Sequence, residues 1–174
     1  MKHVALFILP LALAILATPA LAQENTHIKT ATVAIVHPQG WNKASENDER
    51  RIASFVESRT ENRIDILSKL IIREEHAPAL FEAFADQIIE NGFTVVSNAT
   101  EKSFVLSDGR LRKGEWSEYS YTTSNIPISI ITYTFTAQNM AYIVVAYFSR
   151  AEREGGIEKL TELIQNMVDI APQN

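Results

Sequence analysis

Residues 128–149 read ISIITYTFTAQNMAYIVVAYFS, and this segment carries the strongest structural signal in the chain. It holds two runs of β-branched and aromatic residues, 128–136 and 140–149, which the polar pair Gln138-Asn139 separates. Such runs are typical of β-strands, and a short polar break between them is typical of a hairpin turn. We therefore expect two antiparallel strands that are joined at Gln138-Asn139.

Both faces of these two strands are apolar. A strand with one face in water would show a cleaner alternation of apolar and polar residues. The two strands should therefore lie centrally in a sheet that is covered on both sides, which requires at least two covering elements. In the first strand, one face has Ile131, Tyr133 and Phe135 and the other has Ile128 and Ile130. In the second strand, one face has Tyr142, Val144 and Phe148 and the other has Ile143, Val145 and Tyr147.

Two segments with helical periodicity can supply these covers. Residues 77–91 have their apolar residues on one helical face with Phe84 at its centre, and Pro78 and Gly92 suit the two ends of such a helix. Near the C-terminus, apolar residues again repeat at intervals of three or four before Pro172. The apolar positions are Leu80, Phe81, Phe84, Ala85, Ile88 and Ile89 in the first segment, and Ile157, Leu160, Ile164 and Met167 in the second.

Five further segments have the composition of strands. The resulting order is three strands, a helix, about four strands and a closing helix. Hairpin connections give an antiparallel sheet, so the sequence predicts an α+β fold. We expect a mainly antiparallel sheet of about six to seven strands between two helices, an α/β/α sandwich. The five segments are 30–37, 51–59, 63–72, 93–96 and 111–122.

The N-terminus has the pattern of a cleaved export signal. A short basic start leads into the apolar residues 4–17, and Ala20-Leu21-Ala22 matches the small-x-small motif of signal peptidase. The alternative is an uncleaved anchor, but the apolar run is shorter than the about 20 residues that a membrane span needs. We expect a signal peptide over 1–22, a flexible leader over 23–29 and a single α+β domain over 30–171.

The composition limits the functions that are open to the chain. Its 174 residues are 46% hydrophobic and 21% charged, as in globular proteins. The absence of cysteine excludes disulfides, thiol catalysis and cysteine-bound metals, and in an exported protein it fits a bacterial periplasm. The formal charge of −5 argues against a nucleic-acid partner. We expect a periplasmic or secreted protein with no stable membrane insertion after cleavage.

The order of elements points to a known group of folds. Pro38-Gln39-Gly40-Trp41 follows the first strand of the domain, and a hairpin, a helix, an antiparallel meander and a closing helix come after it. In this order and in its Pro-x-Gly-Trp motif, the chain resembles the PsbP-like superfamily and its bacterial DcrB-like relatives over about residues 30–170. The resemblance implies an α/β/α sandwich and a non-enzymatic accessory protein that binds a larger assembly.

Motifs for catalysis and metal binding are missing from the sequence. It has no nucleophile elbow, no dinucleotide fingerprint, no zinc-protease motif and no EF-hand loop. Glu74-Glu75-His76 offers suitable ligand types, but three adjacent residues in an extended segment do not converge on one ion. We therefore expect no metal site and no cofactor.

An alternative reading is a small periplasmic hydrolase that depends on carboxylates. Asp48, Glu115 and Glu118 would then be the general acids or bases. Side chains alternate between the two faces of a strand, so the three-residue spacing of Glu115 and Glu118 places them on opposite faces. We therefore expect a protein that is not an enzyme.

Four aromatic residues, Trp41, Trp116, Tyr119 and Tyr121, are the candidate binding residues. They could line an aromatic groove for a ligand, or they could pack in the core where strands end. We interpret the sequence as an exported, non-catalytic binding or accessory protein of the bacterial cell envelope. Its expected partner is an envelope protein or a small apolar ligand.

Overall fold

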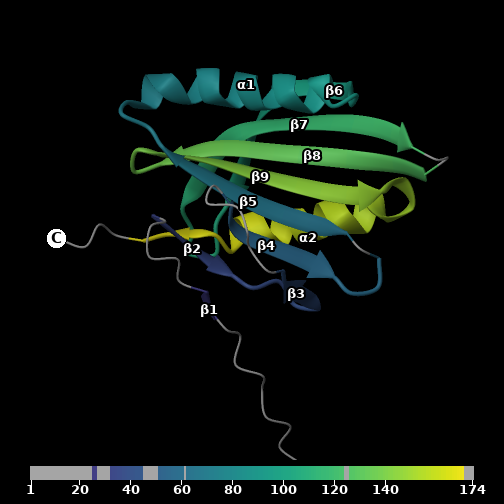
Figure 1. Ribbon diagram of the computed structural model, residues 1–174. Coiled ribbons are helices and arrows are strands. Elements are labelled where there is room, and N and C mark those ends of the chain that lie inside the picture. Colours follow the sequence, from purple (N-terminus) through teal and green to yellow (C-terminus); the bar gives the residue numbers. More distant parts are fainter. Residues whose placement is uncertain (1–24, 27–31, 45–50, 61, 124–125, 171–174) are drawn as a thin grey trace, which may run out of the picture.

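The computed structural model describes residues 25–26, 32–44, 51–60, 62–123 and 126–170 (Figure 1). The expected signal peptide at 1–22 lies outside these residues, and so does Asp48. None of the helices in the described ranges is long and apolar enough to cross a membrane.

A seven-stranded sheet forms the centre of the molecule, with its strands in the order β3-β4-β5-β9-β8-β7-β6. Every neighbouring pair is antiparallel. β9 and β8 occupy the fourth and fifth places, the central position that their two apolar faces predict. The strands are β3 (Trp41–Lys43), β4 (Arg51–Glu57), β5 (Arg63–Leu70), β6 (Thr94–Val105), β7 (Leu111–Thr123), β8 (Ile126–Ala137) and β9 (Met140–Ser149).

A helix covers each face of this sheet (Figure 1). The 3-10 helix η1 (Glu74–His76) leads into α1 (Ala77–Glu90) on one face, and η2 (Arg150–Glu152) leads into α2 (Arg153–Gln165) on the other. A small antiparallel sheet, β1-β2-β10, packs on the α2 side. Its strands are β1 (Asn25–Thr26), β2 (Val33–Val36) and β10 (Val168–Asp169). The α+β sandwich expected from the sequence is confirmed.

The hairpin between β8 and β9 has the turn that its sequence predicts. Ala137 pairs with Met140, and Gln138 and Asn139 between them have φ values of 49° and 62°. Positive φ at both central residues is the mark of a type I′ turn, whose twist matches that of the flanking strands. This turn fixes the register that sends Tyr133 toward α2 and Ile130 toward α1.

The core on the α2 side is tightly packed. Leu160 and Ile164 of α2 are fully buried among side chains of the sheet. Gly156 lets the helix approach β9 closely, since a Cβ there would lie 2.5 Å from the ring of Phe148. At that distance a side chain forces its neighbours to move, so this position requires glycine.

The core on the α1 side is looser. Only Ala77 and Ile88 of α1 are buried, whereas Phe84 at the centre of its apolar face is half-buried. Ile89 is 46% exposed, although its spacing predicts a place on the packed face. The apolar stripe of α1 therefore contacts the sheet without filling the space beneath the helix.

Four elements differ from the sequence-based expectation. β6 covers residues 94–105 and not 93–96, because an edge strand pairs through its backbone and needs no apolar alternation. β1, β3 and β10 are two or three residues long, too short to give a periodic signal. β1 lies within the segment expected to be a leader and pairs with β2.

Candidate functional site

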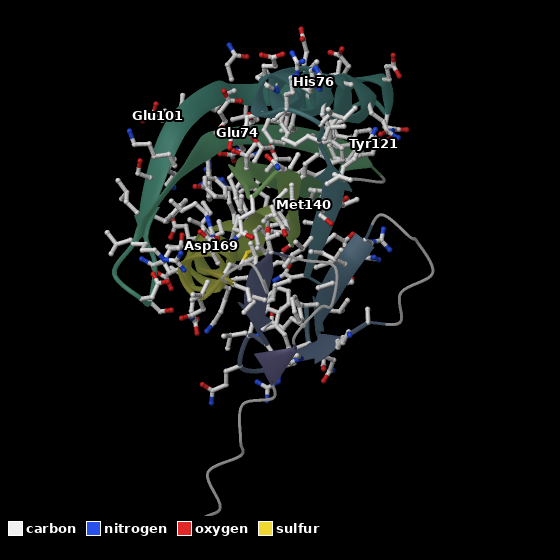
Figure 2. The ribbon with its side chains drawn as sticks, turned by 90° about the vertical axis from the view of Figure 1, so that its left-hand side faces the viewer. Glu74, His76, Glu101, Tyr121, Met140 and Asp169 are labelled. Carbon is white, nitrogen blue, oxygen red and sulfur yellow. The ribbon has the colours of Figure 1, made fainter. Side chains whose placement is uncertain are left out.

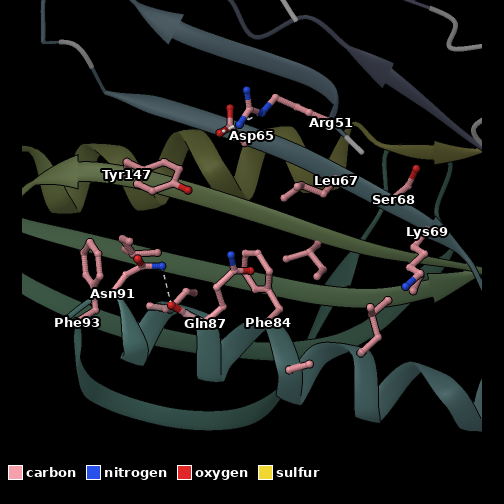
Figure 3. A pocket seen from close by; sticks show the side chains of 16 residues that line it. Arg51, Asp65, Leu67, Ser68, Lys69, Phe84, Gln87, Asn91, Phe93 and Tyr147 are labelled. Atoms are coloured by element: carbon pink, nitrogen blue, oxygen red, sulfur yellow. Dashed lines mark hydrogen bonds and ion pairs between the residues drawn. The ribbon is translucent and has the colours of Figure 1, made fainter. Parts of the chain in front are cut away.

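A cleft of about 760 Å³ lies between α1 and the β4–β5 half of the sheet (Figure 3). Its wall on the helix follows one stripe, Leu80, Phe84, Gln87 and Asn91, next to the stripe that packs on β8 and β9. The strands supply an apolar floor of Leu67, Ile130, Ala141 and Ile143. A volume of this size lies in the range of small-molecule sites, which are mostly apolar with a few convergent polar groups.

The position of α1 explains why the space is open. Phe81, Ala85 and Ile88 pack toward β7, β8 and β9, so the helix covers that half of the sheet. At its N-terminal end Ala77 packs with Ile71 and Ala141. The helix is therefore fixed over one half of the sheet, and β5 and β4 extend beyond its cover.

A charged group of side chains forms the wall beside β5. Asp65 is only 3% exposed, and its Oδ1 accepts hydrogen bonds from Ser54 Oγ and from Arg63 Nε, each at 2.7 Å. Arg51 Nε lies 3.4 Å from Asp65 Oδ2. Two guanidinium groups and one hydroxyl thus satisfy a carboxylate whose burial alone would be costly.

A β-bulge aims Arg51 into the cleft. The register of β4 against β5 shifts between Arg51 and Ala53, so that Ile52 and Ala53 both bury in the core on the α2 side. Arg51 pairs with Leu67 and turns toward the face under α1. Its Nε is buried and makes no hydrogen bond to any residue in the described ranges.

Tyr147 lines the cleft at the end where Asn91 and Phe93 also lie (Figure 3). Burial raises the pKa of the Tyr147 hydroxyl, and the nearby Asp65 carboxylate raises that pKa further. The hydroxyl is therefore protonated at neutral pH and can donate a hydrogen bond. Lys69 and Ser68 lie at the opposite end of the cleft.

The four aromatic residues singled out in the sequence do not share one groove. Trp41 is buried on β3, and Trp116 is buried on β7 in the α2-side core, where Lys102 Nζ lies 3.6 Å from its ring centroid. Tyr119 is buried on the opposite face of β7 under α1. Tyr121 is half-buried against Phe93, with ring centroids 5.0 Å apart. None of the four lines the α1 cleft, and three of them occupy core positions.

The candidate carboxylates lie on opposite faces of β7, as their spacing predicts. Glu118 accepts two hydrogen bonds from Arg153, at 2.5 and 2.6 Å, and so holds the start of α2 to the sheet. Glu115 is exposed and pairs across the ladder with Glu101 of the edge strand β6 (Figure 2). Glu115 and Glu118 therefore do not converge on one substrate position.

The metal candidate remains three separate side chains. Glu74 and His76 are exposed at the start of α1 (Figure 2), and Glu75 forms an ion pair with Arg73. Within the described ranges, no three His, Asp or Glu side chains come together as metal ligands.

Sequence reasoning missed the residues that make up the cleft wall. The sequence around Arg51 does not single it out, because nothing local reveals a bulge. Asp65 was the available signal, since it interrupts the apolar run around Ile64 and Ile66 in an expected strand. A carboxylate at such a position requires buried partners, which Arg51 and Arg63 supply.

Comparisons with known proteins bear on the fold. No family model matches the sequence, and no curated protein matches it significantly. Among solved structures, cyanobacterial PsbP (CyanoP) from Synechocystis sp. PCC 6803 matches with a TM-score of 0.62 at 10% identity, over 90% of this chain and 98% of that chain. The chain has a PsbP-like fold.

Two other structures share features of this PsbP-like fold. The Ran-binding protein Mog1p of Saccharomyces cerevisiae matches with a TM-score of 0.53 at 10% identity, over 83% of this chain and 92% of that chain. A protein from Bacteroides thetaiotaomicron VPI-5482 matches with a TM-score of 0.52 at 11% identity, over 80% of this chain. The chain spans about half, 46%, of that protein's length. At such identities the likeness concerns the fold alone.

Proposed function

We propose that this chain is an exported, non-catalytic binding protein of the bacterial cell envelope, and that it holds a small ligand with an apolar body in the α1 cleft. The observation that carries the proposal is the cleft itself, with an apolar floor around Leu67 and Ile143 and a polar wall at Arg51 and Tyr147. Such a surface suits a ligand that has both an apolar and a polar part.

A binding role fits the chemistry of the cleft better than a catalytic one. Its carboxylate, Asp65, already accepts hydrogen bonds from Ser54 and Arg63 and lies beside Arg51. A general base needs a carboxylate oxygen that is free to accept a proton from the substrate, and these contacts already occupy the Asp65 carboxylate. Glu115 and Glu118 lie outside the cleft lining.

The export part of the proposal rests on the sequence of residues 1–22. A basic start, an apolar run and Ala20-Leu21-Ala22 support cleavage after Ala22 and release into the periplasm or the medium.

A second candidate is an accessory role in which the protein docks on a larger envelope protein. The Ran-binding protein Mog1p has a similar fold, and the edge strand β6 exposes Val95 and Val96. An exposed edge strand offers unpaired backbone groups to an incoming strand. This candidate would be favoured if Val96→Lys abolished co-purification of an envelope protein and the purified protein bound no apolar probe.

Binding of Nile red, a neutral apolar fluorophore, tests the proposed cleft. Ala83→Trp places a large side chain at the cleft wall of α1, whereas Ala79→Trp makes the same change at an exposed position of that helix outside the cleft lining. We expect wild type and Ala79→Trp to bind the dye with equal affinity and Ala83→Trp to lose most of that affinity.

Circular dichroism and thermal melts should be the same for both variants, since Ala79 and Ala83 are both exposed positions of α1. Equal dye affinity in the two tryptophan variants, or no binding by the wild type, would refute a ligand site in the cleft.

A further inference from the structure

The geometry of the cleft points to the polar part of the ligand as well. We propose that the ligand is an amphiphilic monocarboxylate, whose carboxylate is held by the guanidinium of Arg51 and the hydroxyl of Tyr147 while its apolar body lies along Leu67 and Ile143. This inference rests on the proposed function, because it requires the α1 cleft to be a ligand site.

The charges around the cleft favour an anion. Among the charged residues that line it, Arg51 and Lys69 are cations and Asp65 is an anion, an excess of one positive charge. Asp65 also pairs with Arg63, which is not part of the cleft lining and donates to its Oδ1 at 2.7 Å. The acidic residues of α1, Glu82, Asp86 and Glu90, do not line the cleft. A ligand that enters along Leu67 therefore meets net positive potential.

Arg51 differs from the other partly buried arginines in its hydrogen bonds, because its Nε is buried without an acceptor among the described residues. Arg63, Arg112 and Arg153 each donate hydrogen bonds to a carboxylate or a carbonyl. Arg51 donates none to the described residues, although three quarters of its side chain is covered, with 24% exposed. Its partner in the cleft is Asp65, whose Oδ2 lies 3.4 Å from Nε, beyond good hydrogen-bond distance. A ligand carboxylate supplies two acceptors in the planar arrangement that a guanidinium matches.

The number of donors selects a monoanion. Arg51 and Tyr147 offer one positive charge and one neutral donor, since the Tyr147 hydroxyl stays protonated at neutral pH. A dianionic phosphate in this partly buried place would keep an uncompensated charge, which is unfavourable. A neutral head group would form a weaker hydrogen bond with the Arg51 guanidinium than a carboxylate does.

The apolar floor defines the other half of the ligand. Leu67 and Ile143 are cross-strand partners on β5 and β9, Ile130 and Phe84 also line the cleft, and Lys69 lies at the far end. An alkyl or aromatic body that covers this surface gains about 25 cal/mol per Å² of apolar area removed from water. The proposed ligand thus combines one carboxylate with an apolar body of moderate length.

Displacement of bound Nile red by three amphiphiles with linear chains of nearly equal length tests the inference. Dodecanoate, dodecanol and dodecyltrimethylammonium differ chiefly in the charge of the head group. We expect dodecanoate to displace the dye with about tenfold or better affinity relative to dodecanol, the effect of one charge-assisted hydrogen bond, and we expect the cation to bind more weakly than dodecanol. Dodecyl phosphate should bind no better than dodecanoate.

Variants of Arg51 assign the preference to the proposed residue. Arg51→Gln should reduce the preference for dodecanoate over dodecanol to about twofold or less while dodecanol affinity stays the same. Arg73→Gln is the control, since Arg73 is exposed and paired with Glu75 outside the cleft lining. Tyr147→Phe keeps the ring and removes the hydroxyl, so it should lower dodecanoate affinity severalfold. This variant tests the assignment if Arg51→Gln does not fold.

The outcomes separate this inference from the proposed function. Equal displacement by dodecanoate and dodecanol would overturn the carboxylate assignment and leave the cleft as a site for apolar ligands. A preference for dodecanoate that survives both Arg51→Gln and Tyr147→Phe would overturn the assignment to these residues. If Nile red does not bind the wild type, the proposed function itself fails.

Discussion

Tyr133 illustrates at the residue scale how burial in this core changes a titration. Its side chain is fully buried on β8, and its hydroxyl donates to the carbonyl oxygen of Arg112 at 3.3 Å. Burial raises the pKa of Tyr133 to about 12, against the opposing effect of the nearby Arg112 charge. The neutral form of this hydroxyl is therefore favoured in the folded protein.

The raised pKa predicts how stability changes at high pH. Between pH values of about 10 and 12 the unfolded chain loses the Tyr133 proton while the folded chain keeps it, so the free energy of unfolding should fall as pH rises. The contribution of Tyr133 is about 2–3 kcal/mol. Urea unfolding at about pH 9 and about pH 12 measures this contribution. Between these two pH values the free energy of unfolding should decrease less for Tyr133→Phe than for wild type. Equal decreases would contradict the assignment.

The two glutamates of β7 give a matched test of local electrostatics. Glu118→Gln removes the charge that pairs with Arg153 at a buried position, and it should lower the free energy of unfolding by about 1–3 kcal/mol. Glu115→Gln, at an exposed position opposite Glu101, should change it by less than about 0.5 kcal/mol. Denaturant unfolding of both variants measures these changes. A similar loss of unfolding free energy in Glu118→Gln and Glu115→Gln would mean that the Glu118–Arg153 ion pair does not stabilise the fold.

At the scale of elements, the two helices differ in how they attach to the sheet. Leu160 on α2 is fully buried, and Leu80 on α1 is half-buried beside the cleft. Leu160→Ala should therefore cost about 2–5 kcal/mol, through lost burial and a residual cavity. Leu80→Ala should cost about 1 kcal/mol, since less apolar area leaves contact. An equal or larger loss for Leu80→Ala in urea unfolding would show that α1 is packed as tightly as α2.

The elements also show what sequence periodicity can and cannot predict. The β8–β9 hairpin, both helices and their buried faces follow from local patterns of apolar residues and from Gln138-Asn139 at the turn. The short strands and the length of β6 depend on pairing with distant segments, which a local pattern does not record. The bulge that aims Arg51 at the cleft is also a property of pairing, so local patterns in the sequence do not predict the candidate site.

At the scale of the whole molecule, the export proposal makes a prediction about the mature chain. When the full sequence is expressed in a bacterium, the protein recovered from the periplasm or the medium should begin at Gln23, because cleavage is expected after Ala22. Intact-mass measurement reads this directly. Ala22→Asp should block processing, because the small-x-small motif requires a small residue at that position. Leu21→Val is the control and should leave processing unchanged, because the middle position of the motif accepts other residues. A full-length, membrane-bound product from the unaltered sequence would contradict the proposal.

We propose that the molecule uses the two faces of one sheet differently, with a packed core under α2 and a ligand cleft under α1. A methyl NMR titration with dodecanoate compares the two faces in one sample. Methyl signals of Leu67, Ile88 and Ile143 on the cleft side should shift in a saturable manner, while those of Leu160 and Ile164 under α2 should stay in place. Shifts that are confined to the α2 side, or no saturable shifts on the cleft side, would contradict the claim.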